Sequence, residues 1–295
     1  MSKINVRKIT ISAIFLSLAL VTKLLFTVYL PIFGANGMKI GLTGIFSAFP
    51  AILFGPMYGG IVTALLDFLG CIIKPSGAYI PWFTVVAFIG GFLKGLVWKS
   101  IKNTNEKWLR IVVIIALIAV GILGVSNSIM LNSDGVNGSY FETAANSPEI
   151  KEDLSIISQM IITRAEATKS PQTNLDKYIL YVTTALIVFS IMGILIMVMD
   201  YFINKKFDSG KNTHSTFKIF MSLLISGLVV TTINTQLLRM FVYNSWSDVA
   251  FLLLWIPRAI EEVVVCMVHS YVIAVLYNIL VKYLHITSIE NTAKN

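Results

Sequence analysis

Eight long apolar runs constrain what this 295-residue chain can fold into. A helix needs about 20 mostly apolar residues to cross a bilayer. The runs are Ile9–Leu30, Ile40–Phe54, Met57–Ile73, Pro81–Trp98, Leu109–Leu131, Tyr178–Ile203, Phe217–Tyr243 and Val249–Tyr283. Only 13% of the residues are charged, against about 25% in soluble domains. This composition excludes a disordered chain and disfavours a soluble enzyme. We therefore predict an all-α integral membrane protein with about eight transmembrane helices.

The positive charges orient this predicted bundle. An even number of spans places both termini on one side. The short segments on that side carry most of the lysines and arginines, namely Lys3, Arg7, Lys8, Lys99, Lys102, Lys107, Arg110, Lys205, Lys206, Lys211, Lys218, Lys282 and Lys294. Positive charge marks the cytoplasmic side, so we expect both termini to be cytoplasmic. The net charge of +8 then reflects topology, and we expect no nucleic-acid partner.

A polar stretch from about residue 132 to 177 is predicted to be a long extracellular loop. Within it, Glu149–Lys169 carries apolar residues at near-helical spacing, which is typical of an amphipathic helix. That helix could be a lid over a binding site, or it could serve only packing and solubility. The sequence leaves both explanations open.

Charges inside the apolar runs are costly in hydrocarbon and need a reason. With the topology above, Lys23, Asp67, Arg239 and Arg258 converge on the outer leaflet. The short outer loops add Lys74, Tyr79 and Trp82 at the same level. These residues predict a pocket that is open to the outside. The alternative is that the charges only neutralise one another.

Three further details of the polar residues in the apolar runs complete the prediction. Arg258 has Glu261 and Glu262 three and four residues later on the same helix face, where pairing is possible. Asn234 could face a ligand or bond across helices. Lys94 lies near the inner end of its run and can extend its ammonium group to the interface.

Catalytic patterns are weak. Glu261 and Glu262 followed by His269 resemble part of a metalloprotease motif, but no second histidine lies at membrane depth. The two cysteines, Cys71 and Cys266, lie in apolar runs and are interpreted as small buried hydrophobes. No Walker-type phosphate loop is present in the sequence. We predict a protein that is not an enzyme and holds no metal.

The run from Phe54 to Trp98 resembles the substrate-binding S components of energy-coupling factor (ECF) vitamin transporters, most closely the folate family. The matching features are the turn Phe54-Gly55-Pro56, Asp67, the loop Pro75–Tyr79, and then Pro81, Phe83 and Thr84. Ile233-Asn234-Thr235 and Ile256-Pro257-Arg258 resemble the last two helices of that family. The resemblance covers about residues 5–100 and 215–284.

This resemblance implies a six-helix bundle in a bacterial cell membrane that binds folate or a related vitamin near the outer face. It implies docking on a membrane T subunit with two ATPase subunits, which would hydrolyse the ATP. This chain itself would then need no cofactor. The family's first helix carries Ala-x-x-x-Ala, which packs on the T subunit; here the positions are Ala13 and Ser17. Transport would follow toppling of the loaded S component.

Two departures from the family pattern shape the remaining expectations. Residues 104–214 are predicted to be an inserted helix pair with the long loop, between family-like parts at 1–103 and 215–295. Ile80-Pro81-Trp82-Phe83 replaces Phe-Pro-Gly-Phe, which would change the substrate contacts.

The expected substrate-binding residues divide by chemistry. A pterin ring suits stacking on Trp82 or Tyr79 and hydrogen bonds to Asp67 or Asn234. A glutamate tail suits Arg258, Arg239 or Lys74. The alternative function is a self-sufficient secondary transporter or channel for a small polar solute.

Overall fold

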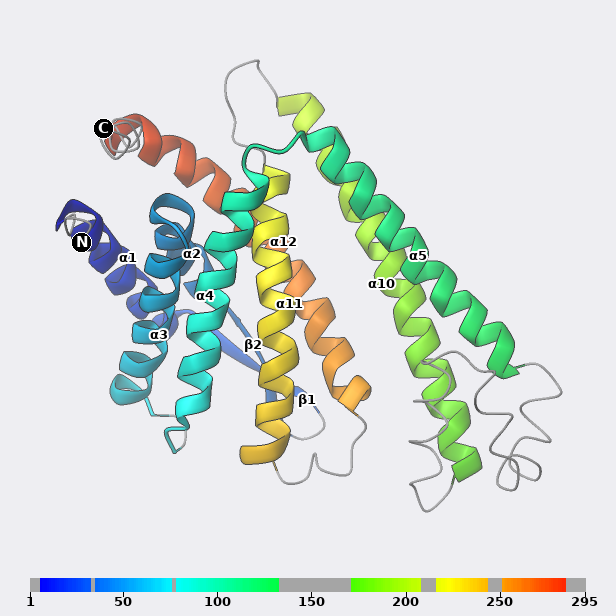
Figure 1. Ribbon diagram of the computed structural model, residues 1–295. Coiled ribbons are helices and arrows are strands. Elements are labelled where there is room, and N and C mark those ends of the chain that lie inside the picture. The colour runs from blue at the N-terminus through cyan, green and yellow to red at the C-terminus, as the bar shows by residue number, and fades with distance from the viewer. Residues whose placement is uncertain are drawn as a thin grey trace. The chain divides into compact units, whose positions relative to one another are not determined.

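The computed structural model describes residues 6–32, 35–75, 78–132, 171–207, 216–243 and 251–284. Within these ranges the chain forms eight α-helices and one β-hairpin (Figure 1). The helices are α1 (Val6–Leu25), α2 (Thr43–Phe54), α3 (Pro56–Ile73), α4 (Pro81–Ile101), α5 (Glu106–Asn132), α10 (Pro171–Phe207), α11 (Thr216–Phe241) and α12 (Phe251–Leu284). Six of them, α1, α3, α4, α5, α11 and α12, are long and apolar enough to cross a membrane. The prediction of a helical, multi-pass membrane protein with about eight helices is confirmed.

The helical fold also contains a β-hairpin that was not predicted from the sequence. Strands β1 (Thr27–Ile32) and β2 (Ala35–Gly41) pair antiparallel, with Thr27 opposite Gly41 at the base. The predicted span Ile9–Leu30 therefore stops at Leu25, and the span predicted from Ile40 begins at Thr43. Strand β1 contains Thr27, Val28, Tyr29 and Ile32, and residues of these types favour strands. Apolarity alone did not distinguish these strands from helix.

Helix α10 begins earlier than the apolar run that predicted it. Helix α10 begins at Pro171, so residues 171–177, which were predicted to lie in the loop, are helical. The amphipathic helix predicted over Glu149–Lys169 lies outside the described residues. Its role stays open.

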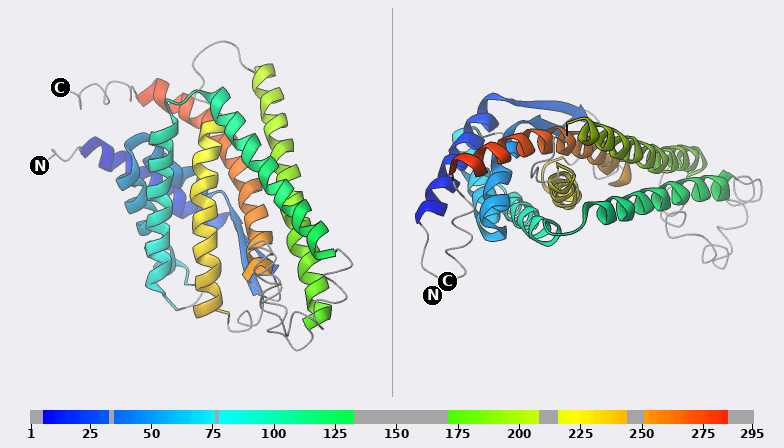
Figure 2. Two further views of the ribbon diagram at one scale, coloured as in Figure 1. Left: turned by 45° about the vertical axis from the view of Figure 1, so that its right-hand side comes forward. Right: turned by 90° about the horizontal axis from the view of Figure 1, so that it is seen from above.

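The chain divides into two compact units, which are described separately. Unit 1 comprises Met1–Glu106 and Asp208–Asn295, and unit 2 comprises Lys107–Phe207. Unit 1 thus contains α1 to α4, the hairpin, α11 and α12. The start of α1 and the end of α12 lie at the same end of unit 1 (Figure 2). The description of 104–214 as an insertion stays a prediction.

The turn between α2 and α3 depends on Gly55. Its φ of 99° lies in a region that side chains disfavour and glycine tolerates. Pro56 then opens α3, where its fixed φ suits a first helical residue and its missing N–H costs no bond. The predicted turn at Phe54-Gly55-Pro56 is confirmed.

Small residues bring the helices of unit 1 close together. A side chain at Gly91 would collide with α3, where Thr63 donates a hydrogen bond of 2.7 Å to the Ala87 carbonyl of α4. On the other side, Ser226 donates to the Gly90 carbonyl at 2.7 Å. Close backbone approach and such bonds are what hold helices together in lipid. Gly90, Gly91 and Gly95 are accordingly all buried in α4.

Unit 2 is an antiparallel pair built from the same chemistry. Ser190 of α10 is buried and donates to the Leu117 carbonyl of α5 at 2.7 Å. Gly121 leaves room for Ser190, and Gly193 leaves room for Leu117. The outer positions of α5 are apolar and exposed, as expected of a helix in contact with lipid.

Candidate functional site

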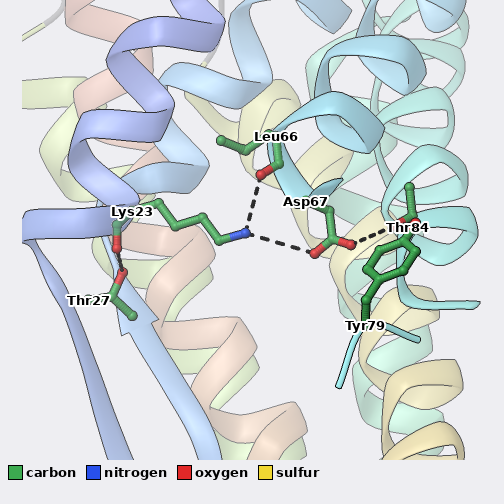
Figure 3. A network of polar contacts seen from close by, with 6 residues as sticks. All are labelled: Lys23, Thr27, Leu66, Asp67, Tyr79 and Thr84. Carbon is green, nitrogen blue, oxygen red and sulfur yellow. Dashed lines mark hydrogen bonds and ion pairs between the residues drawn. The ribbon is translucent and has the colours of Figure 1, made fainter. Parts of the chain in front are cut away.

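Unit 1 contains two polar clusters, and the first joins α1, α3 and α4 (Figure 3). The Lys23 ammonium donates to the Leu66 carbonyl at 3.2 Å and lies 3.9 Å from Asp67 Oδ1. Thr84 donates to Asp67 Oδ2 at 2.8 Å. The Tyr79 hydroxyl lies 2.9 Å from the Thr84 hydroxyl. We call these residues the Lys23–Asp67 cluster.

The Lys23–Asp67 cluster is well satisfied by the protein itself. Both oxygens of Asp67 have protein partners, and the side chains of Lys23 and Asp67 are only 17% and 25% exposed. Thr27, the first residue of β1, donates to the Lys23 carbonyl at 2.6 Å. The cluster therefore joins the base of the hairpin to α3 and α4. This geometry favours the neutralisation alternative for Asp67 over direct ligand contact.

The second cluster lines a cavity of about 220 Å³ between the hairpin base and α2, α4, α11 and α12. Its lining residues are Thr27, Gly41, Thr43, Gly44, Lys94, Leu223, Glu262, Val265, Cys266 and His269. Glu262 and His269 lie in the middle third of the apolar span Leu254–Tyr277. An ammonium, a carboxylate, an imidazole and a hydroxyl thus share one cavity inside an apolar bundle. Such convergent polar groups are typical of a ligand site.

Glu262 lies in a notch on α11. A side chain at Gly227 would overlap the Glu262 carboxylate, so glycine makes the room. Thr231 donates to Glu262 Oε2 at 3.4 Å, and the Cys266 thiol donates to Oε1 at 3.3 Å. The Thr231 contact is long for an O–H donor and the thiol is a weak donor, so two neutral groups satisfy this carboxylate less well than charged donors would.

His269 connects α12 to the hairpin base. Its side chain is 8% exposed, and Nε2 lies 3.0 Å from the Gly41 carbonyl. A carbonyl only accepts, so Nε2 carries the proton in this contact. Gly44 leaves space for the ring, because a side chain there would collide with it. Thr43 Oγ1 is buried and has no hydrogen-bond partner within the described part of the chain.

The polar residues of α12 form a continuous track that ends in the cavity. Arg258, Glu262, Cys266 and His269 are spaced by four, four and three residues, which places them on one helix face. Arg258 donates to Thr235 of α11 at 3.1 Å. One turn further along, Thr231 contacts Glu262. A ligand in the cavity could therefore extend along the α11–α12 seam to Arg258.

The structure separates the predicted substrate-binding residues. Asp67 and Tyr79 belong to the Lys23–Asp67 cluster, whereas Arg258 lies on the α12 track. Asn234 lies on α11 with Oδ1 buried and without a partner among the described residues. The others are Arg239 in the last turn of α11, Lys74, which is exposed, and Trp82, which is 57% exposed. Their roles stay predictions.

The predicted docking residues lie on the outside of α1. Ala13 and Ser17 are both exposed, and Ser17 donates to the Ala13 carbonyl one turn earlier at 3.0 Å. This bond turns the hydroxyl back onto its own helix. The pair therefore presents a small, smooth surface that a neighbouring helix could approach closely.

Several cavity residues were missed or misjudged from sequence. Lys94 was assigned to the membrane interface, and His269 was considered only as a metal ligand. Cys266 is buried, as predicted, and it also contacts Glu262, whereas Cys71 is only partly buried. Across the described residues, no group of three or more His, Cys, Asp or Glu side chains could hold a metal ion. The spacing of Glu262, Cys266 and His269 on one helix face was the signal that could have identified the track.

Comparison with known proteins places the chain among vitamin transporters. The model of the ECF-type riboflavin transporter S component family matches residues 3–163, more than half of the chain. The folate transporter FolT of Clostridium novyi is 33% identical over 133 residues, which are 45% of this chain and 69% of that protein.

A second relative and the solved structures complete the comparison. The folate transporter FolT of Leuconostoc mesenteroides is 28% identical over 100 residues, 34% of this chain and 50% of that protein. No solved structure matches the chain significantly. The predicted resemblance is thereby confirmed, and the chain belongs to the family of ECF-type riboflavin transporter S components.

Proposed function

We propose that this chain is the membrane-embedded S component of an ATP-driven vitamin importer, and that it binds folate or a related pteridine in the cavity lined by Glu262 and His269. The observation that carries the proposal is the cavity itself: convergent polar groups within an apolar bundle, closed on one side by the hairpin base. The printed names of the two relatives supply the vitamin class.

The size and shape of the site support a ligand with a flat head and a charged tail. A cavity of about 220 Å³ suits a fused two-ring head and leaves the rest of a folate outside. The tail would then follow the α12 track, where Arg258 and Arg239 lie on adjoining helices. Arginine binds carboxylates through paired, charge-assisted hydrogen bonds.

The partners follow from the family. A T subunit and two ATPase subunits would supply the energy, so no cofactor is needed in this chain. The chain would lie in a bacterial cell membrane with both termini in the cytoplasm, as the positive charges predict. The exposed pair Ala13 and Ser17 would contact the T subunit.

The proposal is tested by binding to the full-length chain in lipid nanodiscs. Calorimetry with folate and with riboflavin should show one tight site for folate. Absence of binding to every vitamin tried would contradict the proposal. Uptake by this chain alone in liposomes, without ATPase partners, would favour the secondary-transporter alternative.

The docking surface is tested by Ser17→Trp. A tryptophan on the smooth face of α1 should abolish uptake by the assembled complex, because it blocks close helix approach. Vitamin binding by the isolated chain should stay unchanged, since Ser17 lies on the outside of α1. Loss of binding in this variant would count against a docking role.

A further inference from the structure

The matching family is named for riboflavin, which carries a flavin ring, and the two relatives are named for folate, which carries a pterin ring. The Glu262 carboxylate has the chemistry to distinguish these two rings. We propose that the Glu262 carboxylate is the specificity determinant of the cavity: it selects a heterocycle that presents two adjacent hydrogen-bond donors, as a 2-amino-4-oxopyrimidine ring does, and rejects a uracil-type edge. This inference rests on the proposed function, because it assigns the head of the vitamin to the same cavity.

The first step is the unused bonding capacity of Glu262. Each carboxylate oxygen can accept about two hydrogen bonds. The structure gives each oxygen one contact with a neutral donor, Thr231 at 3.4 Å and the weakly donating Cys266 thiol at 3.3 Å. Neither Lys nor Arg forms an ion pair with Glu262 in the part of the chain that the structure describes. A carboxylate at membrane depth is costly without strong partners, so donors from a ligand complete its environment.

The second step concerns Arg258, whose charge interacts with those of Glu261 and Glu262 but which forms no direct ion pair with Glu262 among the described residues. That arginine lies one turn from Glu262 on the same face of α12, where pairing was predicted as an alternative. Its Nη1 instead donates to Thr235 at 3.1 Å. Glu262 therefore faces the cavity without a direct salt bridge to its nearest arginine.

The third step is the match between atoms. Ionised Glu262 offers two acceptor oxygens side by side and no donor. The ring N–H and the exocyclic amino group of a 2-amino-4-oxopyrimidine donate in parallel, in the way an arginine fork meets a carboxylate. A flavin ring presents one N–H flanked by two carbonyl oxygens. Docked on Glu262, that edge would place a carbonyl oxygen against a carboxylate oxygen.

The fourth step is that other residues lining the cavity are hydrogen-bond donors, whereas Glu262 is an acceptor. The Lys94 ammonium and the Thr43 hydroxyl both line the cavity. Thr43 Oγ1 is buried without a partner in the described residues. Both groups can donate to a ring carbonyl, which a 2-amino-4-oxopyrimidine carries next to its donor edge. The cavity thus offers acceptors and donors for one polar edge of a single ring.

The experiment uses two matched probes that differ mainly at one ring position. Pterin carries a 2-amino group and lumazine a 2-oxo group on the same bicyclic pteridine. Their affinities are measured by calorimetry or competition on the full-length wild-type chain, on Glu262→Gln and on the control Glu261→Gln. Glu261 precedes Glu262 on α12 and does not line the cavity.

The wild-type chain should bind pterin about 10- to 100-fold more tightly than lumazine, the ratio expected for charge-assisted bonds. Glu262→Gln should reduce that ratio to near one, because the amide offers only one acceptor. Glu261→Gln should keep the wild-type ratio.

Other outcomes overturn the inference in distinguishable ways. If wild type binds folate and Glu262→Gln keeps the wild-type ratio, Glu262 does not select the head, although the proposed function stands. If wild type prefers lumazine or riboflavin, the selection rule is wrong and the S-component function still stands. If wild type binds no vitamin, both proposals fail. If Glu262→Gln does not fold, the ratio of pterin to lumazine affinity in the wild-type chain still tests whether the cavity prefers the 2-amino ring.

Discussion

The two polar clusters of unit 1 each contain an acid at membrane depth, and they differ in how that acid is satisfied. Asp67 has a lysine and a threonine as partners. Glu262 has two contacts with neutral groups and an adjoining cavity of about 220 Å³. The difference indicates that the first cluster stabilises the fold, whereas the second has unused capacity to recognise a ligand.

The largest expected effect on binding comes from Glu262→Gln. Folate affinity should fall about 10- to 100-fold because a charge-assisted pair of bonds is lost. The melting temperature of the unliganded chain should change little, since the neutral contacts from Thr231 and Cys266 can persist. Calorimetry and a thermal melt measure the two quantities. A large drop in melting temperature with unchanged folate affinity would show that Glu262, like Asp67, stabilises the fold and does not bind the ligand.

The corresponding experiment on the Lys23–Asp67 cluster is the substitution Lys23→Met. It leaves Asp67 at membrane depth without its cation, which should lower the free energy of unfolding by about 1–3 kcal/mol. Folate affinity of the folded fraction should stay within a few fold of wild type. Adding Asp67→Asn should restore part of the lost stability. An affinity loss as large as that of Glu262→Gln would place this cluster in the ligand site.

A third change, Arg258→Ala, asks how far the ligand site extends along the α12 track. Folate affinity should fall about tenfold, because an arginine contact to the charged tail is lost. Pterin, which has no tail, should bind as it does to wild type. Equal losses for both ligands would indicate that Arg258 acts on the bundle and not on the tail.

The smallest expected effect is that of Thr84→Val. It removes one hydrogen bond to Asp67 while Lys23 remains, which should cost about 1 kcal/mol of stability. Folate affinity should not change. Chemical or thermal unfolding of the variant beside wild type measures the cost, and a cost above that of Lys23→Met would reverse the order of importance within the cluster.

Much of the fold could be predicted from local sequence. The apolar runs located the helices to within a few residues at most ends, and Gly55-Pro56 marked a turn because backbone geometry there is dictated by two residue types. The hairpin was not predicted, because Thr27–Ile32 is as apolar as the helix before it. Its strands depend on pairing between two segments of the chain, and the apolarity of one segment does not reveal such pairing.

The intramembrane charges could be predicted from the sequence, but the cavity beside Glu262 could not. The sequence predicted that such charges mark a ligand site, and that principle led to both clusters. It placed Asp67, Tyr79 and Trp82 at the outer level of the membrane, assigned Lys94 to the interface and interpreted Cys266 as a small buried hydrophobe. Only the packing of α12 against α11 and the hairpin base showed that Glu262, Cys266 and His269 line one cavity with Lys94.

The sequence by itself determined that this chain is a helical membrane protein, because hydrophobic length and local turn chemistry are properties of neighbouring residues. Its S-component type followed from the resemblance of its motifs to that family. The tertiary structure decided which charges form direct pairs. Lys23 reaches Asp67 across 44 residues of chain, while among the described residues no Lys or Arg forms an ion pair with Glu262. Whether a buried charge is paired depends on distances between helices, and those distances are set by packing.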